Sequence, residues 1–356
     1  MSPMPGADGE ASPILLADYD YDLPPDRIAQ HPVEPRDSSR LLVLHREDGR
    51  ITHRIFRDIG EELRAGDLLV INDTRVLPAR LHGRRETGGR VELLLLSRQD
   101  GGRWEALARP ARRLRPGANV HLLTVAGDES GIAVRVIERR DNGHVVVDVS
   151  PDVESLLADF GEMPLPPYIH ERLEDAERYQ TVFATYPGSA AAPTAGLHFT
   201  PELLARLEAG GVGVARVTLH VGAGTFVPVK VEDARQHQMH AEWYHVPAAT
   251  LAAIRATRGT GGRVIAVGTT SCRTLEAIAD HLDSREDLVG WTDLFIMPGF
   301  RFRVVNGLVT NFHLPKSTLL LLVSAFAGRD HVLRAYREAI DLGYRFYSFG
   351  DAMLIL

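Results

Sequence analysis

The clearest candidate site in this chain is a strand followed by a Gly-Thr-Thr-Ser turn and a helix. Arg263 to Val267 reads as a buried strand, and a helix is expected from Cys272 to about His281. Backbone N–H groups at a helix N-terminus bind carboxylates and phosphates. The side chains that could assist them are Thr269, Thr270, Ser271 and Arg273. The pattern predicts an anion site, with simple capping of the helix as the alternative.

Three histidines stand where elements are expected to meet. His198 precedes a helix start, His220 ends a strand beside Gly222 and Gly224, and His313 precedes the Pro315-Lys316 helix entrance. Strand ends on one edge of an α/β sheet are where ligands bind, and imidazole is suited to general-base chemistry near neutral pH. A lone histidine is more often a hydrogen-bonded structural residue, but three at such junctions indicate at least one chemical role.

Other polar and glycine-rich segments add fewer candidates. His237, His240 and His245 lack the HExxH arrangement, so no metal site is predicted from them. Gly222 and Gly224 would let a flat ligand approach the backbone, although Val227 breaks the dinucleotide fingerprint. Only two of the 40 basic residues are lysines, and Lys316 is the one beside other candidates. A lysine kept there indicates a need for a compact, titratable ammonium.

Composition limits the class of protein. The 356 residues predict two domains, and the 44% hydrophobic and 24% charged content is that of a globular protein. One cysteine, Cys272, excludes an intrachain disulfide, and residues 1–17 read as a disordered leader without the features of a signal peptide. No apolar run is long enough to cross a membrane, so we expect a cytoplasmic protein. Neither a Walker A motif nor a Gly-x-Ser-x-Gly elbow is present.

Charge is distributed unevenly along the chain. The net charge is −7, yet residues 75–115 hold eleven arginines and four acids, a balance of +7. Short strands with Gly-rich turns follow one another over 76–150 and predict a small antiparallel β-barrel inserted into a larger α/β domain of residues 18–75 and 151–356. The arginines predict an RNA-facing barrel, unless they only solubilise its surface.

The larger domain shows recognisable helix and turn signals. Thr200-Pro201 predicts a helix start, and leucine-rich sequence after Ser317 predicts a further helix. A helix is expected over about Asp330 to Leu342, before a C-terminal strand. Asn306-Gly307 between two apolar segments predicts a hairpin.

Several stretches, in order, resemble the signature segments of the S-adenosylmethionine:tRNA ribosyltransferase-isomerase family of queuosine biosynthesis. The resemblance runs from about Asp18 to the C-terminus and rests on DYDLPPDRIAQHPVEPRDSSRLLVL, INDTRVLPARLHG, AAPTAGLHFT, LHVGAGTFVPV, MHAEWY, VGTTSCRTLE, GWTDLFIMPGFRFRVVNGLVTNFHLPKSTLLLLVSAFAG and YRFYSFGDAML. It implies transfer of the ribosyl group of S-adenosylmethionine to 7-aminomethyl-7-deazaguanine in a tRNA anticodon. Epoxyqueuosine, adenine and methionine would be the products, with no metal or bound cofactor.

The chemistry implied by the resemblance needs a base at C5′ and a group that assists the departing adenine. His198, His220, His313 and Lys316 are the candidate catalytic residues. Lys316 would act as a base if burial lowered its pKa, and would otherwise bind the methionine carboxylate. Thr269, Thr270, Ser271 and Arg273 suit that carboxylate, and Gly222 and Gly224 suit adenine or ribose. Asp293 and Glu242 could pair with the sulfonium or ammonium, and Asp73 and Arg75 could orient the deazaguanine.

Two other classes remain open at this point. A methyltransferase would release S-adenosylhomocysteine from the same substrate, and an RNA-binding module would release nothing. We expect a monomer whose partners are tRNA and S-adenosylmethionine.

Overall fold

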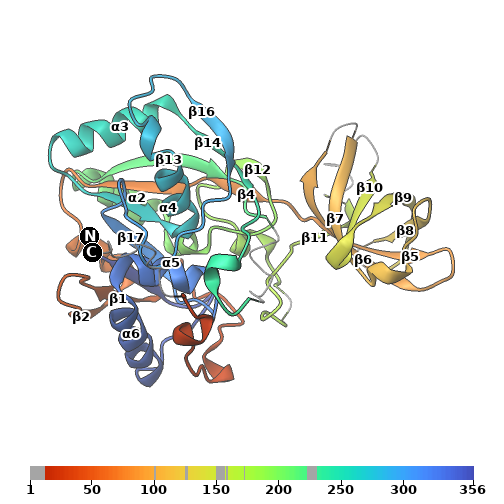
Figure 1. Cartoon of the computed structure of the whole chain (residues 1–356), viewed down its shortest axis with the longest axis horizontal. Helices are drawn as coiled ribbons and strands as arrows, with labels where there is room; N and C mark the ends of the chain where they lie inside the picture. The colour runs from red at the N-terminus through yellow and green to blue at the C-terminus, as the bar shows by residue number, and fades with distance from the viewer. Residues whose placement is uncertain are drawn as a thin grey trace, which may run out of the picture.

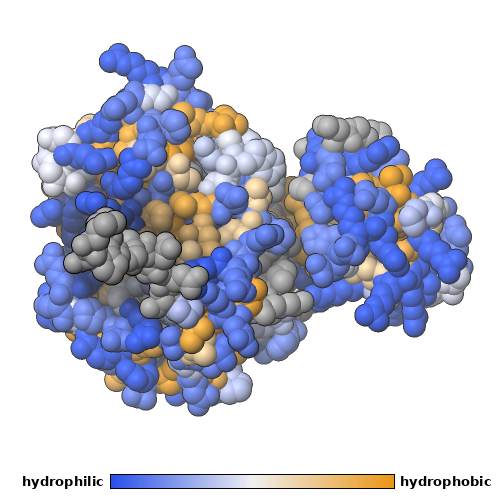
Figure 2. All heavy atoms as spheres, viewed as in Figure 1, coloured by the Kyte–Doolittle hydropathy of each residue, from blue (hydrophilic) through white to orange (hydrophobic). Residues whose placement is uncertain are grey.

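The computed structural model describes residues 13–99, 102–124, 127–149, 157, 159–171, 173–222 and 231–356. These residues form a large mixed α/β domain with a smaller antiparallel β-barrel beside it (Figure 1). This confirms the expected fold class. Figure 2 shows hydrophilic residues over most of the visible face of both domains, with apolar residues gathered in the middle of the large domain.

A mixed sheet of nine strands runs through the described part of the large domain. Five of its strands are almost wholly buried, because helices or loops cover both faces of the sheet. In spatial order the strands are β16 (Leu288–Thr292), β14 (Glu242–Val246), β13 (Gly213–Leu219), β3 (Leu68–Asn72), β15 (Val264–Val267), β17 (Gly307–Asn311), β18 (Ala352–Ile355), β1 (Arg40–Leu44) and β2 (Ile51–Ile55).

The four central strands β13, β3, β15 and β17 run parallel to one another. Their carboxyl ends therefore meet at one edge of the sheet, which is where α/β proteins bind ligands. The chain leaves that edge at Asp73, His220, Gly268 and Phe312. The topology thus brings together the segments in which sequence placed most of the candidate residues.

Helices pack on both faces of the sheet. α2 (Pro201–Ala209) covers one face, where Leu203 and Leu207 join the side chains of Leu69 and Ile71 in one apolar cluster. The other face carries α3 (Ala248–Gly259), α4 (Gly268–Ala277), α5 (Thr318–Ala327) and α6 (Arg329–Asp341). The predicted helix starts are confirmed, because the hydroxyls of Thr200 and Ser317 accept hydrogen bonds from the backbone N–H groups three residues later, at Leu203 and Leu320.

The barrel closes because β5 pairs with both β6 and β8. Alternate side chains of its strands point inward, as in β7, and form a separate apolar core. β4 (Thr74–Val76), which precedes the barrel in the chain, pairs in parallel with β12 (Tyr186–Ser189), which follows it, to form a two-stranded ribbon. The barrel strands are β5 (Arg80–Arg85), β6 (Arg90–Arg98), β7 (Arg103–Arg109), β10 (His144–Asp148), β9 (Glu129–Arg139) and β8 (Asn119–Leu123), with β11 (Gly161–Glu162) added beside β5.

Three local features differ from the sequence-based expectation. The predicted hairpin at Asn306-Gly307 is wrong: residues 301–306 form no strand, and β17 pairs with β15 and β18. The reason is Glu276, whose buried carboxylate accepts the backbone N–H groups of residues 303–305. Helix α4 begins at Gly268, four residues before the expected start. Leu16, within the expected leader, is buried against the large domain, whereas residues 1–12 lie outside the described residues.

Candidate active site

A pocket of about 390 Å³ opens at the carboxyl edge of the parallel strands, between the start of α4 and the segment that joins β17 to α5. Its volume lies in the range of small-molecule sites, roughly 300–1,000 Å³. Its lining combines apolar and aromatic residues with nearly as many polar ones. The sequence-predicted residues that line it are Glu242, Thr269, Thr270, Arg273, His313 and Lys316.

A buried ion pair between Arg273 and Glu242 forms one wall of the pocket. The Nε of Arg273 also donates to the Leu294 carbonyl at 3.0 Å, and Glu242 Oε1 accepts the Gly222 N–H at 2.9 Å. The Nη2 of Arg273 is buried without a hydrogen-bond partner among the described residues. Because an unpaired buried donor is costly, this atom is suited to an anionic ligand.

The first turn of α4 supplies further groups for an anion. Gly268 has φ of 90°, a left-handed value that allows the strand to turn directly into the helix. Thr269 and Thr270 line the pocket, and Thr270 Oγ1 is a second buried atom without a partner among the described residues. Ser271 differs, since its hydroxyl donates to the Val267 carbonyl at 2.9 Å and does not line the pocket. The positive end of the helix dipole reinforces this anion site.

His313 lies in the pocket wall, within hydrogen-bond distance of Thr310. Its Nε2 is 2.7 Å from Thr310 Oγ1, and its backbone N–H donates to the Tyr336 hydroxyl at 3.0 Å. Burial lowers the pKa of His313 to about 3, so the imidazole is neutral at physiological pH. The imidazole is therefore able to accept a proton, although this low pKa makes it a weaker base than a histidine that titrates near neutral pH.

Lys316 lies at the mouth of the pocket and is not buried. Its side chain is 50% exposed, and its ammonium pairs with Asp20 at 2.6 Å. The backbone of Lys316 is left-handed, with φ of 56°, and its N–H donates to the Tyr19 carbonyl at 2.9 Å. The N-terminal segment therefore helps to hold this lysine in place.

His198 lies behind the pocket. Its Nδ1 is 2.7 Å from the Ser39 hydroxyl, and its Nε2 is 3.2 Å from the side-chain amide of Asn311, which does line the pocket. Burial, with help from Arg345 and Arg36, lowers the pKa of His198 to about 3. Any influence of His198 on a ligand would pass through Asn311.

His220, Asp73 and Arg75 are not brought to the pocket. His220 stacks on Trp243, with ring centroids 4.9 Å apart, and its Nδ1 is 2.8 Å from Thr74 Oγ1. Since Trp243 neighbours Glu242 on β14, their side chains point to opposite faces, and His220 lies on the face away from Glu242. Burial lowers the pKa of His220 to about 4.

The remaining candidates lie at different places around this region. Burial raises the pKa of Asp73, whose carboxylate accepts a hydrogen bond from Thr218 at 2.7 Å. Arg75 pairs with Glu177 at the surface, and Asp293 is exposed outside the pocket lining. Gly224 lies outside the described residues.

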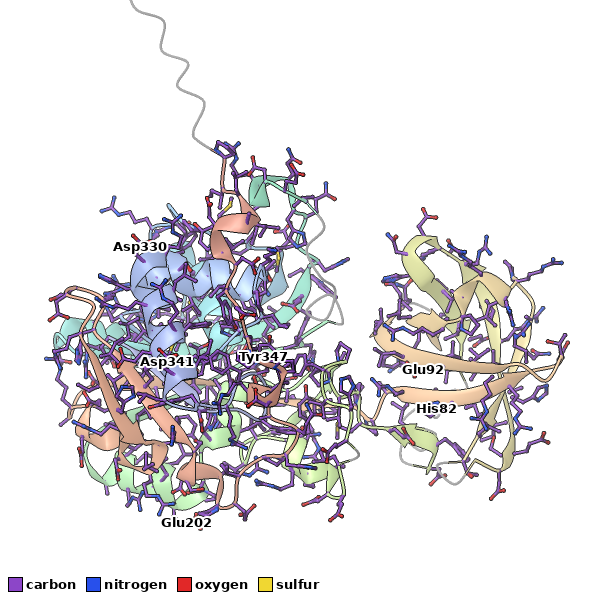
Figure 3. All side chains as sticks on the ribbon, turned by 90° about the horizontal axis from the view of Figure 1, so that it is seen from below. His82, Glu92, Glu202, Asp330, Asp341 and Tyr347 are labelled. Carbon is purple, nitrogen blue, oxygen red and sulfur yellow. The ribbon has the colours of Figure 1, made fainter. Side chains whose placement is uncertain are left out.

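Aromatic residues that sequence reasoning missed form another wall of the pocket. The rings of Tyr168 and Tyr347 lie 4.7 Å apart, and the Tyr168 hydroxyl is 2.7 Å from Ser348 Oγ. Figure 3 labels Tyr347 within the large domain, and His82 and Glu92 mark the barrel. Tyr347 has a left-handed φ of 70°, a strained conformation of the kind found at functional sites. Neither tyrosine could be predicted as a site residue from a helical or strand pattern, because both lie in loops.

The described residues contain no group of three or more His, Cys, Asp or Glu side chains that could hold a metal ion. No described helix is long and apolar enough to cross a membrane.

The sequence from residue 16 to residue 355 matches the model of a family described as "Queuosine biosynthesis protein". The chain belongs to this family. Two curated relatives named S-adenosylmethionine:tRNA ribosyltransferase-isomerase, from Symbiobacterium thermophilum and Desulfitobacterium hafniense, are 60% and 54% identical to it. Each alignment covers 96% of this chain and 100% of the relative.

A solved crystal structure shares the fold of this chain. The crystal structure of S-adenosylmethionine tRNA ribosyltransferase from Thermotoga maritima is 43% identical, with a TM-score of 0.55. The match covers 95% of this chain and 100% of that one. The present chain is thus an enzyme, a transferase that modifies tRNA in queuosine biosynthesis.

Proposed function

We propose that this enzyme transfers and isomerises the ribosyl group of S-adenosylmethionine onto 7-aminomethyl-7-deazaguanine at the wobble position of tRNA. The products are epoxyqueuosine-tRNA, adenine and methionine. The observation that carries the proposal is the pocket, in which Arg273 Nη2 and Thr270 Oγ1 are buried without partners at the start of α4. Two relatives that align with 96% of this chain are named S-adenosylmethionine:tRNA ribosyltransferase-isomerase.

The two ends of S-adenosylmethionine differ in chemistry, and so do the walls of the pocket. The methionine carboxylate suits Arg273 Nη2, the Thr270 hydroxyl and the N-terminus of α4. The planar adenine suits the aromatic wall of Tyr168 and Tyr347. The carboxylate of Glu242 contributes negative charge near the sulfonium, while its pair with Arg273 keeps that guanidinium oriented.

The reaction begins with loss of a proton from C5′, which the adjacent sulfonium acidifies. The electron pair released there forms a C4′=C5′ bond and breaks the C4′–O4′ bond, and O4′ then becomes the C1′ carbonyl oxygen as adenine leaves C1′ and takes up a proton. The amine of the deazaguanine adds to C4′ of the resulting vinyl sulfonium and loses one proton, and the C5′ ylide so formed bonds to C1′ to close the five-membered carbon ring. The alkoxide on C1′ displaces sulfur from C5′, which closes the epoxide, breaks the C–S bond and releases methionine as a neutral thioether.

His313 is the first candidate for the C5′ base, because it is a neutral imidazole in the pocket wall. Lys316, at the pocket mouth beside Asp20, is placed to meet the second substrate or the methionine carboxylate. His198 and His220 would act from outside the pocket lining, His198 through Asn311. Arg75 and Asp73 remain candidates for contact with the deazaguanine.

The proposal includes no resident metal or cofactor, since S-adenosylmethionine is consumed. It also takes the enzyme to be monomeric and to work in the cytoplasm, where tRNA is modified. The aminomethyl nucleobase is supplied by tRNA, with the arginine-rich barrel as an RNA-facing module.

Release of free adenine tests the proposal. The enzyme is incubated with S-adenosylmethionine and tRNA carrying 7-aminomethyl-7-deazaguanine, and the small molecules are separated chromatographically. Adenine should form only when both substrates are present. S-adenosylhomocysteine in its place would mean a methyltransferase, and no product with retained tRNA binding would mean an RNA-binding protein.

A further inference from the structure

One end of the barrel gathers nine arginines. Neighbouring barrel strands are antiparallel, so the ends of β5, β7 and β9 meet the beginnings of β6, β8 and β10 there. The chain joins the barrel to the large domain at the opposite end, before β5 and after β10. We call the set the distal arginine surface: Arg84, Arg85, Arg90, Arg109, Arg112, Arg113, Arg115, Arg139 and Arg140.

Most of these guanidinium groups are exposed and lack an acidic partner. Among the described residues, Arg140 alone in the set forms ion pairs, with Glu105 and Glu138. Elsewhere in the chain arginines are commonly paired, as Arg54 is with two glutamates and Arg263 is with Asp67. Positively charged guanidinium groups at one end of the barrel repel one another when no acidic groups neutralise them. A polyanionic partner would neutralise them, so this surface is suited to one.

The surface also lacks the groups that other polyanionic partners require. None of the large exposed hydrophobic side chains of the described residues belongs to the barrel strands or turns. Binding to a membrane surface depends on apolar residues that enter the lipid, and reading of single-stranded bases depends on aromatic stacking. Guanidinium groups without apolar or aromatic neighbours are suited to the phosphate oxygens of an RNA backbone.

The strands set how far this surface lies from the domain junction. β6 has nine residues, so the barrel extends about 25–30 Å from one end to the other. Contacts at its far end would therefore reach RNA that is remote from the base in the pocket.

We propose that the distal arginine surface binds the phosphate backbone of the tRNA away from the modified base, without reading sequence. This inference rests on the proposed function only in taking tRNA as the partner. Its role is to position the substrate and supply affinity. It predicts the same contribution for cognate and non-cognate tRNA.

The test replaces Arg109, Arg112, Arg113 and Arg115 by glutamine in one variant. All four are exposed and have no acidic partner among the described residues, so the fold should be retained. A matched control variant carries R258Q, R285Q, R301Q and R337Q, four exposed arginines of the large domain. Both variants lose the same charge, and circular dichroism and thermal melting check their folding.

The readout is the dissociation constant of unmodified tRNA transcripts, measured against NaCl concentration without S-adenosylmethionine. Each lost phosphate contact lowers the magnitude of the slope of the logarithm of the dissociation constant against the logarithm of the salt concentration by about 0.7–0.9. Loss of four contacts should therefore lower this slope by about 3. The slope should fall for the barrel variant with cognate and non-cognate transcripts alike, and the control should bind as wild type.

Several outcomes would overturn the proposal. They are an unchanged slope in the barrel variant, an equal loss in the control, or loss of binding only to phosphatidylserine vesicles with tRNA binding intact. If the four-residue variant does not fold, R112Q/R113Q should lose about half as much slope, and an unchanged slope there would count equally against it. The tRNA-binding assay uses no S-adenosylmethionine, so its result does not depend on adenine release. Failure of the enzyme to release adenine would leave the binding result valid. Normal adenine release would not save the proposal about the distal arginine surface if tRNA binding were unchanged.

Discussion

Replacement of Arg273 by glutamine should weaken binding of S-adenosylmethionine and destabilise the fold, for two separable reasons. Arg273 Nη2 is buried without a protein partner among the described residues, so it is free to bind the ligand's carboxylate. A hydrogen bond to a charged group contributes about 1.5–3 kcal/mol, which corresponds to roughly 10- to 150-fold in affinity. The same change leaves the buried Glu242 carboxylate unpaired, which costs about 3–5 kcal/mol of stability.

A double-mutant cycle separates the two effects. E242Q/R273Q removes both buried charges, so it should recover much of the stability that R273Q loses, without recovering affinity for S-adenosylmethionine. Chemical denaturation measures stability, and isothermal titration calorimetry at a temperature where each variant is folded measures affinity. Wild-type affinity in folded R273Q, or affinity that returns with stability in the double variant, would refute the assigned role of Arg273.

Three further predictions follow from the buried groups of the large domain. H313A should lower the rate of adenine release by about 10²–10⁴-fold while the protein stays folded, and wild-type turnover in H313A, H198A, H220A and K316A alike would remove every candidate base. Burial holds the folded-state pKa of His198 and His313 at about 3, so the unfolded chain binds more protons below its ordinary histidine pKa and stability falls as pH falls. When the pH falls from about 7.5 to about 5.5, each of the two histidines should lower the free energy of unfolding by about 1.4 kcal/mol. In urea titrations over this pH range, the free energy of unfolding of H313Q should therefore fall by about 1.4 kcal/mol less than that of the wild type. E276A should destabilise the protein by about 3 kcal/mol or more, because it strands three backbone N–H groups, and E276Q should lose less; equal stability of E276A and wild type in the same titrations would contradict this.

Local sequence patterns predicted the fold where a single rule operates. Alternating side chains and Gly-rich turns gave the barrel strands, and a capping threonine with proline gave the start of α2. The hairpin at Asn306-Gly307 failed because a distant carboxylate, Glu276, takes the N–H groups that a strand would have used. That contact is tertiary and leaves no local signal.

In the candidate site too, the sequence predicted the residues that one local element or one sheet edge places together. Thr270 and Arg273 lie on one short helix start, so their proximity follows from sequence, and the parallel strands bring His313 to the same edge. His220 could not be assigned to a face, since one residue's difference in strand register sends a side chain to the opposite side. Tyr168 and Tyr347 come from separate loops that only the folded chain brings together.

The fate of two labels in S-adenosylmethionine tests the central claim most directly. The ribosyl carbons carry one isotope and the methyl group carries another, and the tRNA is recovered after reaction and digested for mass spectrometry. The ribosyl label should enter the modified nucleoside, and the methyl label should leave in methionine. Methyl label in the tRNA without ribosyl label would contradict the account.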